Sequence, residues 1–111
     1  MNRTNELRDT VRRVLTDVAS MMPSENDVRT ELVCNDTEGH YQLGQVGWEA
    51  GRRVDDIFLH VDVLDGKIWI QHDGTDLPLA RMLEEAGIRK DEIVLAFHRP
   101  DLRKYTEYAA A

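Results

Sequence analysis

Apolar residues recur at helical spacing in the N-terminal part of the chain. Three- and four-residue steps separate Leu7, Val11, Val14, Val18 and Met21. This spacing aligns them along one side of an α-helix, and the charged residues of the same stretch fall outside the stripe. We therefore predict an amphipathic helix over residues 5–22, ended by Pro23 and Ser24.

The next two apolar stretches have the two-residue period of β-strands. Residues 28–34 alternate charged with apolar or small side chains, which predicts a strand with one buried face. Residues 40–48 begin in the same way, but Val46 and Trp48 fall in the opposite phase to the first apolar residues. Gly44 stands at the change of phase, so we expect a β-bulge in this strand.

Asp65-Gly66 lies between two further alternating runs, residues 57–64 and 67–72. Glycine tolerates a positive φ, and Asp-Gly in this setting predicts a tight hairpin. Counting back from a two-residue loop gives the expected cross-strand partners: Leu64–Lys67, Val63–Ile68, Asp62–Trp69, Val61–Ile70 and His60–Gln71.

This register assigns the side chains of the hairpin to two faces. The face expected to be core comprises Ile57, Leu59, Val61, Val63, Ile68 and Ile70, with His72 at its margin. The opposite face carries Phe58, His60, Asp62, Trp69 and Gln71. Aromatic residues are enriched where proteins meet, so we take this second face together with Trp48 as a candidate interface. Its self-association would give a two-fold dimer, and the alternative is that the C-terminal part of the same chain covers it.

The C-terminal half contains signals for a second helix. Within residues 73–88, Thr75 or Asp76 can cap a helix that has Pro78 in its first turn and Gly87 just beyond its end. Proline costs nothing in a first turn, because its missing N–H would have no partner there in any case. We therefore predict a short helix between the hairpin and the last apolar run.

Residues 92–98 form that run, which stops before Pro100 and predicts a strand buried on both faces. In the tail, Tyr105 and Tyr108 can anchor one turn of helix. The order of elements predicts an α+β fold, with the N-terminal helix and the second helix packed on a largely antiparallel sheet of four to five strands. No repeat or linker divides the chain, so we expect a single domain over residues 1–111. The neighbour of the last strand in the sheet stays open.

Composition narrows the range of functions. The 111 residues include 21 acidic and 14 basic ones and give a net charge of −7. Direct tight binding to DNA is not expected, because it depends on neutralising phosphates. The single cysteine excludes an internal disulfide, and the chain has neither a secretion signal nor the ~20-residue apolar run of a spanning helix. We therefore expect a cytoplasmic protein with no membrane association.

His60 and Asp62 are the strongest candidates for chemistry, since residues two apart on one strand share a face. A metal site is not favoured, because no His-x-x-His or Cys-x-x-Cys spacing occurs and Cys34 has no partner thiol. We predict no catalytic residue, no metal and no cofactor. The alternative is a small metal-dependent or acid–base enzyme built on His60, Asp62 and His72, although the expected register places His72 on the other face.

Several motifs occur in a characteristic order and spacing. They are VGW at 46–48, DGKIWIQ at 65–71, DGT at 73–75, and EIVL, FH and P within 92–100. In this combination the chain resembles the XisI family, the fdxN element excision controlling factor proteins, from the N-terminal helix to the YTEYA of the tail. Ala96 stands where a glycine is common in that family, and Asp76 stands where a glutamate is common. Both departures affect local packing only.

The resemblance implies an XisI-like fold and a role in controlling the excision of a DNA element that interrupts a nitrogen-fixation gene. A separate recombinase cuts and rejoins the DNA, and a companion called XisH has a nuclease-like fold. No catalytic residues are established for the family, so none is carried over. We expect a non-catalytic accessory protein that contacts a XisH-like companion or a site-specific recombinase, with an antitoxin-like partner of a nuclease as a further alternative.

Overall fold

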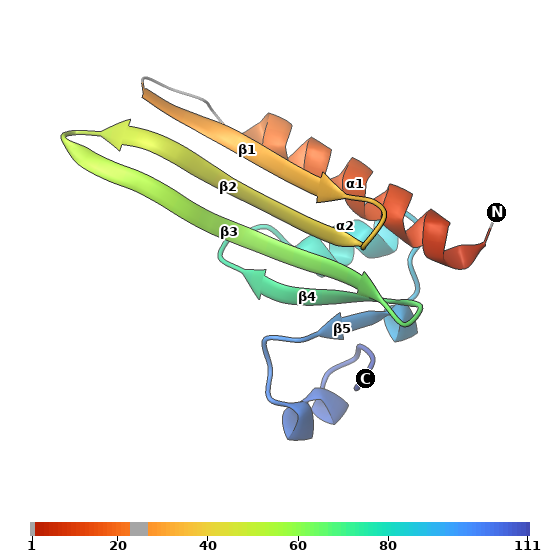
Figure 1. Ribbon diagram of the computed structural model, residues 1–111. Helices are drawn as coiled ribbons and strands as arrows, with labels where there is room; N and C mark the ends of the chain where they lie inside the picture. The colour runs from red at the N-terminus through yellow and green to blue at the C-terminus, as the bar shows by residue number, and fades with distance from the viewer. Residues whose placement is uncertain (1, 23–26) are drawn as a thin grey trace.

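The computed structural model describes residues 2–22 and 27–111. In chain order the elements are α1 (Arg3–Met21), β1 (Asp27–Asn35), β2 (His40–Glu49), β3 (Arg52–Leu64), β4 (Lys67–Asp73), α2 (Leu79–Glu85), the 3-10 helix η1 (Lys90–Glu92), β5 (Ile93–Leu95) and the 3-10 helix η2 (Pro100–Tyr105). This arrangement confirms the predicted α+β fold (Figure 1). Pro23 and Ser24, the expected end of the first helix, lie outside the described residues.

The five strands form one sheet in the order β1-β2-β3-β4-β5. The first four make the expected antiparallel meander, and β5 pairs in parallel with β4. The β3–β4 hairpin closes at Asp65 and Gly66, whose φ values of +53° and +74° fit the predicted two-residue turn. The connection through α2 therefore places the last strand beside β4, the position that the sequence left open.

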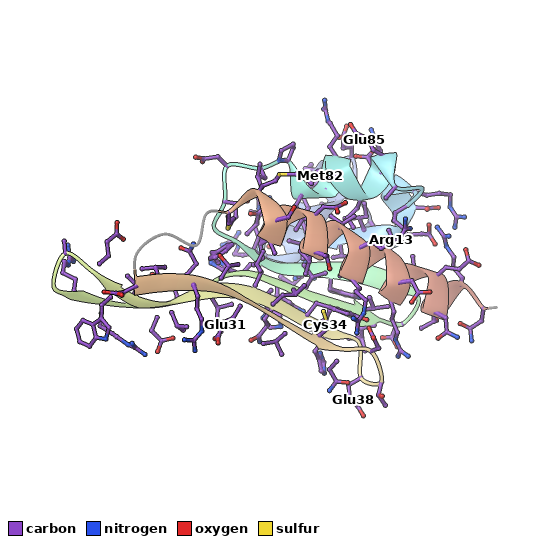
Figure 2. The ribbon with its side chains drawn as sticks, turned by 90° about the horizontal axis from the view of Figure 1, so that it is seen from above. Arg13, Glu31, Cys34, Glu38, Met82 and Glu85 are labelled. Carbon is purple, nitrogen blue, oxygen red and sulfur yellow. The ribbon has the colours of Figure 1, made fainter. Side chains whose placement is uncertain are left out.

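Both helices cover the same side of the sheet, which we call the helix face (Figure 2). The largest buried side chains between the two layers are Leu7, Val11, Leu15, Val18, Tyr41, Leu43, Leu59, Ile68, Ile70, Leu79, Leu83 and Ile93. The opposite side, which we call the open face, is covered by neither helix. No helix in the described part of the chain has the length and apolar character that crossing a bilayer would require.

The first turn of α1 is held by a capping residue and by an ion pair. Asn2 caps the helix, since its Oδ1 accepts the N–H of Asn5 at 2.9 Å. The guanidinium of Arg3 donates to both carboxylate oxygens of Glu92, at 2.5 and 2.8 Å. Glu92 is buried, and these hydrogen bonds lower its pKa to about 2. The pair thus ties α1 to the segment that leads into β5.

The predicted bulge exists, but its extra residue lies in β3 and not in the strand of Gly44. Leu43 pairs with Leu59 and Gly44 pairs with Ile57, which leaves Phe58 without a partner in β2. The backbone of β3 closes onto Gly44 here, since a Cβ on that glycine would lie 2.5 Å from the carbonyl oxygen of Asp56. The extra residue reverses the side-chain alternation of β3 on the N-terminal side of Leu59. Ile57, predicted as core, is therefore on the open face, and Phe58 packs against the core.

A second irregularity changes the predicted register of the β3–β4 hairpin. The four pairs nearest the turn are as expected, but His60 pairs with His72 and not with Gln71. Gln71 is the extra residue of this bulge. Its side chain still reaches the open face, where Nε2 donates to Oδ2 of Asp62 at 3.1 Å.

The second helix is shorter than the stretch that predicted it. Pro78 precedes Leu79 and no side chain caps the N-terminus. Thr75, one of the two expected caps, instead accepts the N–H of Leu77 at 3.2 Å in the turn before the helix. The end is as predicted, because Gly87 has a φ of +103°.

The predicted strand over residues 92–98 is wrong beyond Leu95. The chain turns there, because the guanidinium of Arg103 binds the carbonyl oxygens of Ala96 and His98, each at 3.0 Å. Phe97, expected to be buried, is 50% exposed as a result. The tail forms the expected helical turn as η2, but with Tyr105 at the surface.

Candidate functional site

The open face carries an apolar strip that crosses the first three strands of the sheet. We define the strip as Val33 of β1, Val46 and Trp48 of β2, and Ile57 of β3. Val33, Trp48 and Ile57 are 59%, 54% and 54% exposed. The alternation of each strand assigns these residues to the side of Glu31, which Figure 2 shows pointing away from the helices.

The strip has a shallow hollow of about 150 Å³ at its centre. Its lining is mixed and consists of Glu31, Val33, Gln42, Gly44, Gln45, Val46, Asp55, Asp56 and Ile57. The guanidinium of Arg53 lies 5.6 Å from the ring centre of Trp48 at the border of the strip. Trp and Arg side chains are enriched at protein–protein hot spots.

A polar cluster lies on the same face, where its His60 shares a cross-strand row with Gln42 and with Val33 of the strip. Oδ1 of Asp62 lies 2.8 Å from Nδ1 of His40 and 3.2 Å from Nε2 of His60, while Gln71 binds Oδ2. The Asp62 side chain is only 15% exposed. His40 was not among the predicted site residues, although the pairing of β2 with β3 places it directly opposite Asp62.

The hydrogen bonds of this cluster join three neighbouring strands, since His40 lies on β2, His60 and Asp62 on β3 and Gln71 on β4. The carboxylate of Asp62 accepts hydrogen bonds on both oxygens. Among the described residues no group of three or more His, Cys, Asp or Glu side chains could hold a metal ion. The ring of His72 lies elsewhere, in a groove on the helix face, as the predicted faces required.

Trp69 is half-buried, unlike Trp48. Its Nε1 donates to the carbonyl oxygen of Leu64 at 3.0 Å. The guanidinium of Arg103 lies 5.7 Å from its ring centre, so η2 covers part of the ring. The alternative considered above, that the C-terminal part of the chain covers the face, therefore holds around Trp69 and not around the apolar strip.

Phe58 is the one predicted interface residue that the structure places on the opposite side. It lines a groove of about 700 Å³ on the helix face, together with Met21, Met22 and Leu77. The bulge in β3 is the reason, because it shifts Phe58 and Ile57 by one position in the alternation. Trp48, His60, Asp62, Trp69 and Gln71 share the open face as predicted. The sequence analysis missed Val33, Val46 and Ile57, since it assigned no exposed aliphatic residue to this face.

The architecture is a two-layer α+β domain with both helices on one face of its sheet. Comparison with protein families identifies it further, because the model of the family described as XisI protein matches residues 1–110. The chain belongs to the XisI family.

Two solved structures support this assignment. A XisI-like protein from Anabaena variabilis ATCC 29413 is 35% identical, with a TM-score of 0.92 over 97% of this chain and 99% of that one. The fdxN element excision controlling factor XisI from the same organism is 31% identical, with a TM-score of 0.86 over 99% of this chain and 100% of that one. None of the curated proteins compared matches this chain.

Proposed function

We propose that this protein is a non-catalytic accessory factor in the control of DNA-element excision and that it acts through protein–protein contacts. The apolar strip on the open face carries this proposal. Its partner is a XisH-like companion or a site-specific recombinase. The name of the similar Anabaena protein, an excision controlling factor, supports the regulatory role.

The exposure of the strip supports docking because folding does not account for it. A side chain such as Trp48 gains about 1.5–3 kcal/mol when it is fully removed from water, and this gain is not realised in the single chain. Exposed apolar patches bordered by polar residues mark interaction sites. Arg53 and the charged residues of β1 supply such a border here.

The charge of the chain supports a protein partner over DNA. A net charge of −7 repels phosphates but favours association with a basic protein surface. Proteins that bind DNA carry such surfaces, so a recombinase or a nuclease-like companion is electrostatically suited to this chain. The protein would then act on DNA excision without contacting DNA itself.

Binding measurements with strip variants test the proposal. Purified XisH-like companion and purified recombinase are titrated separately with the wild type and with Trp48→Ala and Ile57→Ser. We expect one of the two partners to bind the wild type and each substitution to weaken that complex at least tenfold, which corresponds to about 1.4 kcal/mol. Met21→Ser is the matched control, because Met21 is 58% exposed on the helix face. Unchanged affinity of the strip variants, or no binding to either partner, would refute the proposal.

Direct binding of the protein to DNA is tested separately by gel shift across a salt series. We expect the isolated protein to bind duplex DNA only weakly and without the steep salt dependence of phosphate neutralisation. Tight binding that falls sharply with salt would contradict an indirect role.

A further inference from the structure

The two edges of the sheet differ. At the β5 edge the tail returns, and the N–H of Ala109 donates to the carbonyl oxygen of Ile93 at 2.8 Å. At the other edge β1 runs for nine residues, and no strand in the described part of the chain pairs with its outer side. Natural proteins avoid long bare edges, because the unpaired N–H and C=O groups recruit another strand. The charged side chains Asp27, Arg29 and Glu31 restrict which strands can pair with this edge.

The charged residues of β1 can pair with those of a second β1 strand that runs antiparallel to it. In an antiparallel pair of two β1 strands, a register centred on Arg29 sets Arg29 against Arg29 and Asp27 against Glu31. A register centred on Glu31 sets Glu31 against its own copy. A register centred on Thr30 sets Arg29 of each copy against Glu31 of the other, twice. Opposite charges stabilise such cross-strand positions and like charges destabilise them. A register centred on Val28 would also set Asp27 against Arg29 twice, but it overlaps only residues 27–29 of β1. The register centred on Thr30 overlaps residues 27–33 and is therefore favoured.

The helix-side residues of β1 agree with this register. It sets Val28 of each copy against Leu32 of the other, both of which are half-buried in the single chain. Branched apolar pairs of this kind stabilise neighbouring strands. Within one chain, Arg29 and Glu31 already lie on the same face, with Nη2 3.2 Å from Oε2. In the antiparallel pair of strands, Arg29 of one copy and Glu31 of the other are therefore on the same face of the sheet and can form the crossed pairs.

We propose that β1 pairs with β1 of a second copy of this chain, antiparallel and centred on Thr30, to form a two-fold dimer with one continuous sheet. Opposite residues then keep the same face, so the helices of both copies lie on one side and both apolar strips lie on the other. This surface differs from the tryptophan face from which the sequence predicted a dimer. The dimer would double the proposed docking surface. The dimer proposal does not depend on which partner docks there.

A charge-swap experiment tests the register. Sedimentation equilibrium is measured for the wild type, Arg29→Glu, Glu31→Arg and the double variant. We expect the wild type to dimerise, each single variant to weaken the dimer at least tenfold, and the double variant to recover affinity within about threefold, since it restores both pairs. Arg52→Glu is the matched control, because it makes the same change in net charge at an exposed position of β3 away from the edge. A wild type that stays monomeric, or a dimer indifferent to both single variants, would overturn the proposal.

A cross-link tests the position of the axis directly. Directly opposite residues in antiparallel strands have Cα atoms about 4.5–5.5 Å apart, within the range of a disulfide. In a Cys34→Ser background, Thr30→Cys is expected to form a disulfide-linked dimer under mild oxidation. Val33→Cys in the same background is the control, since Val33 is exposed but faces Asp27 of the other copy. Equal cross-linking of both variants would place the contact elsewhere.

Discussion

The helix face and the open face are made by the same strands, yet only the helix face is buried. Leu59 on the helix face is 1% exposed, whereas Ile57, two residues earlier on the same strand, is 54% exposed. The difference arises from a single extra residue, Phe58, which reverses the alternation of β3 between them. The helix face therefore holds the fold together, whereas the apolar strip of the open face is left exposed.

Removing a side chain from each face should show this division most strongly. We expect Leu59→Ala to lower the free energy of unfolding by about 2–5 kcal/mol, because it leaves a cavity between the sheet and the helices. Ile57→Ala, the same kind of truncation on the same strand, should cost less than about 1 kcal/mol, since its side chain is already solvated. Urea unfolding followed by circular dichroism measures both. Similar losses for the two variants would mean that the open face also contributes to folding.

The next largest effect on the free energy of unfolding is expected from the ion pair of Glu92 with Arg3, which ties α1 to the segment before β5. Glu92→Gln should cost about 2 kcal/mol at neutral pH, a figure reduced for the partial exposure of Arg3. The folded pKa of Glu92, about 2, lies below its ordinary value of 4.5, so this stability is fully present above pH 4.5. It is lost as the pH falls from 4.5 towards 2 and the carboxylate takes up a proton.

Asp91→Asn is the control for this prediction. Asp91 forms an exposed ion pair with Arg89, so its loss should change stability by less than about 0.5 kcal/mol. Urea midpoints measured from pH 7 to pH 3 compare the variants. If Glu92→Gln kept the same acid dependence as the wild type, Glu92 would not be the group responsible.

The sequence predicted the elements well because they follow from local signals. The spacing of Leu7 and Val11 marks the helix, and Asp65-Gly66 marks the turn and the four hairpin pairs nearest to it. The class of fold and the face that carries Trp48 and Trp69 also follow from these patterns. Each of them depends on residues close together in the chain.

The errors in the strands lie where a strand departs from strict alternation or depends on distant partners. Nothing in the sequence near Phe58 marks it as the extra residue, because the cause is the close approach of β3 to Gly44 on another strand. The early end of β5 depends on Arg103, which binds carbonyl groups five and seven residues before it. Such contacts exist only once the chain has folded, so periodicity does not reveal them.

The two tryptophans of the open face allow a finer comparison. Trp69 is half-buried under Arg103 and donates a hydrogen bond to the backbone, so Trp69→Ala should destabilise the protein by about 1–2 kcal/mol. Arg103→Ala should reproduce part of this loss and increase the exposure of Trp69, which tryptophan fluorescence in a Trp48→Phe background reports as a red shift. No shift in that background would contradict the coverage of Trp69 by η2.

Trp48→Ala should have the smallest effect on stability, within about 0.5 kcal/mol, because most of the ring is solvated and only Arg53 lies against it. Its effect on partner binding should nevertheless exceed that of Trp69→Ala, because a ring that is 54% exposed is available to another protein. Urea unfolding and partner titration on the same preparations give both quantities for both variants. If Trp48→Ala were the more destabilising of the two, the strip would be part of the folded core, and the distinction between the two faces would fail at that point.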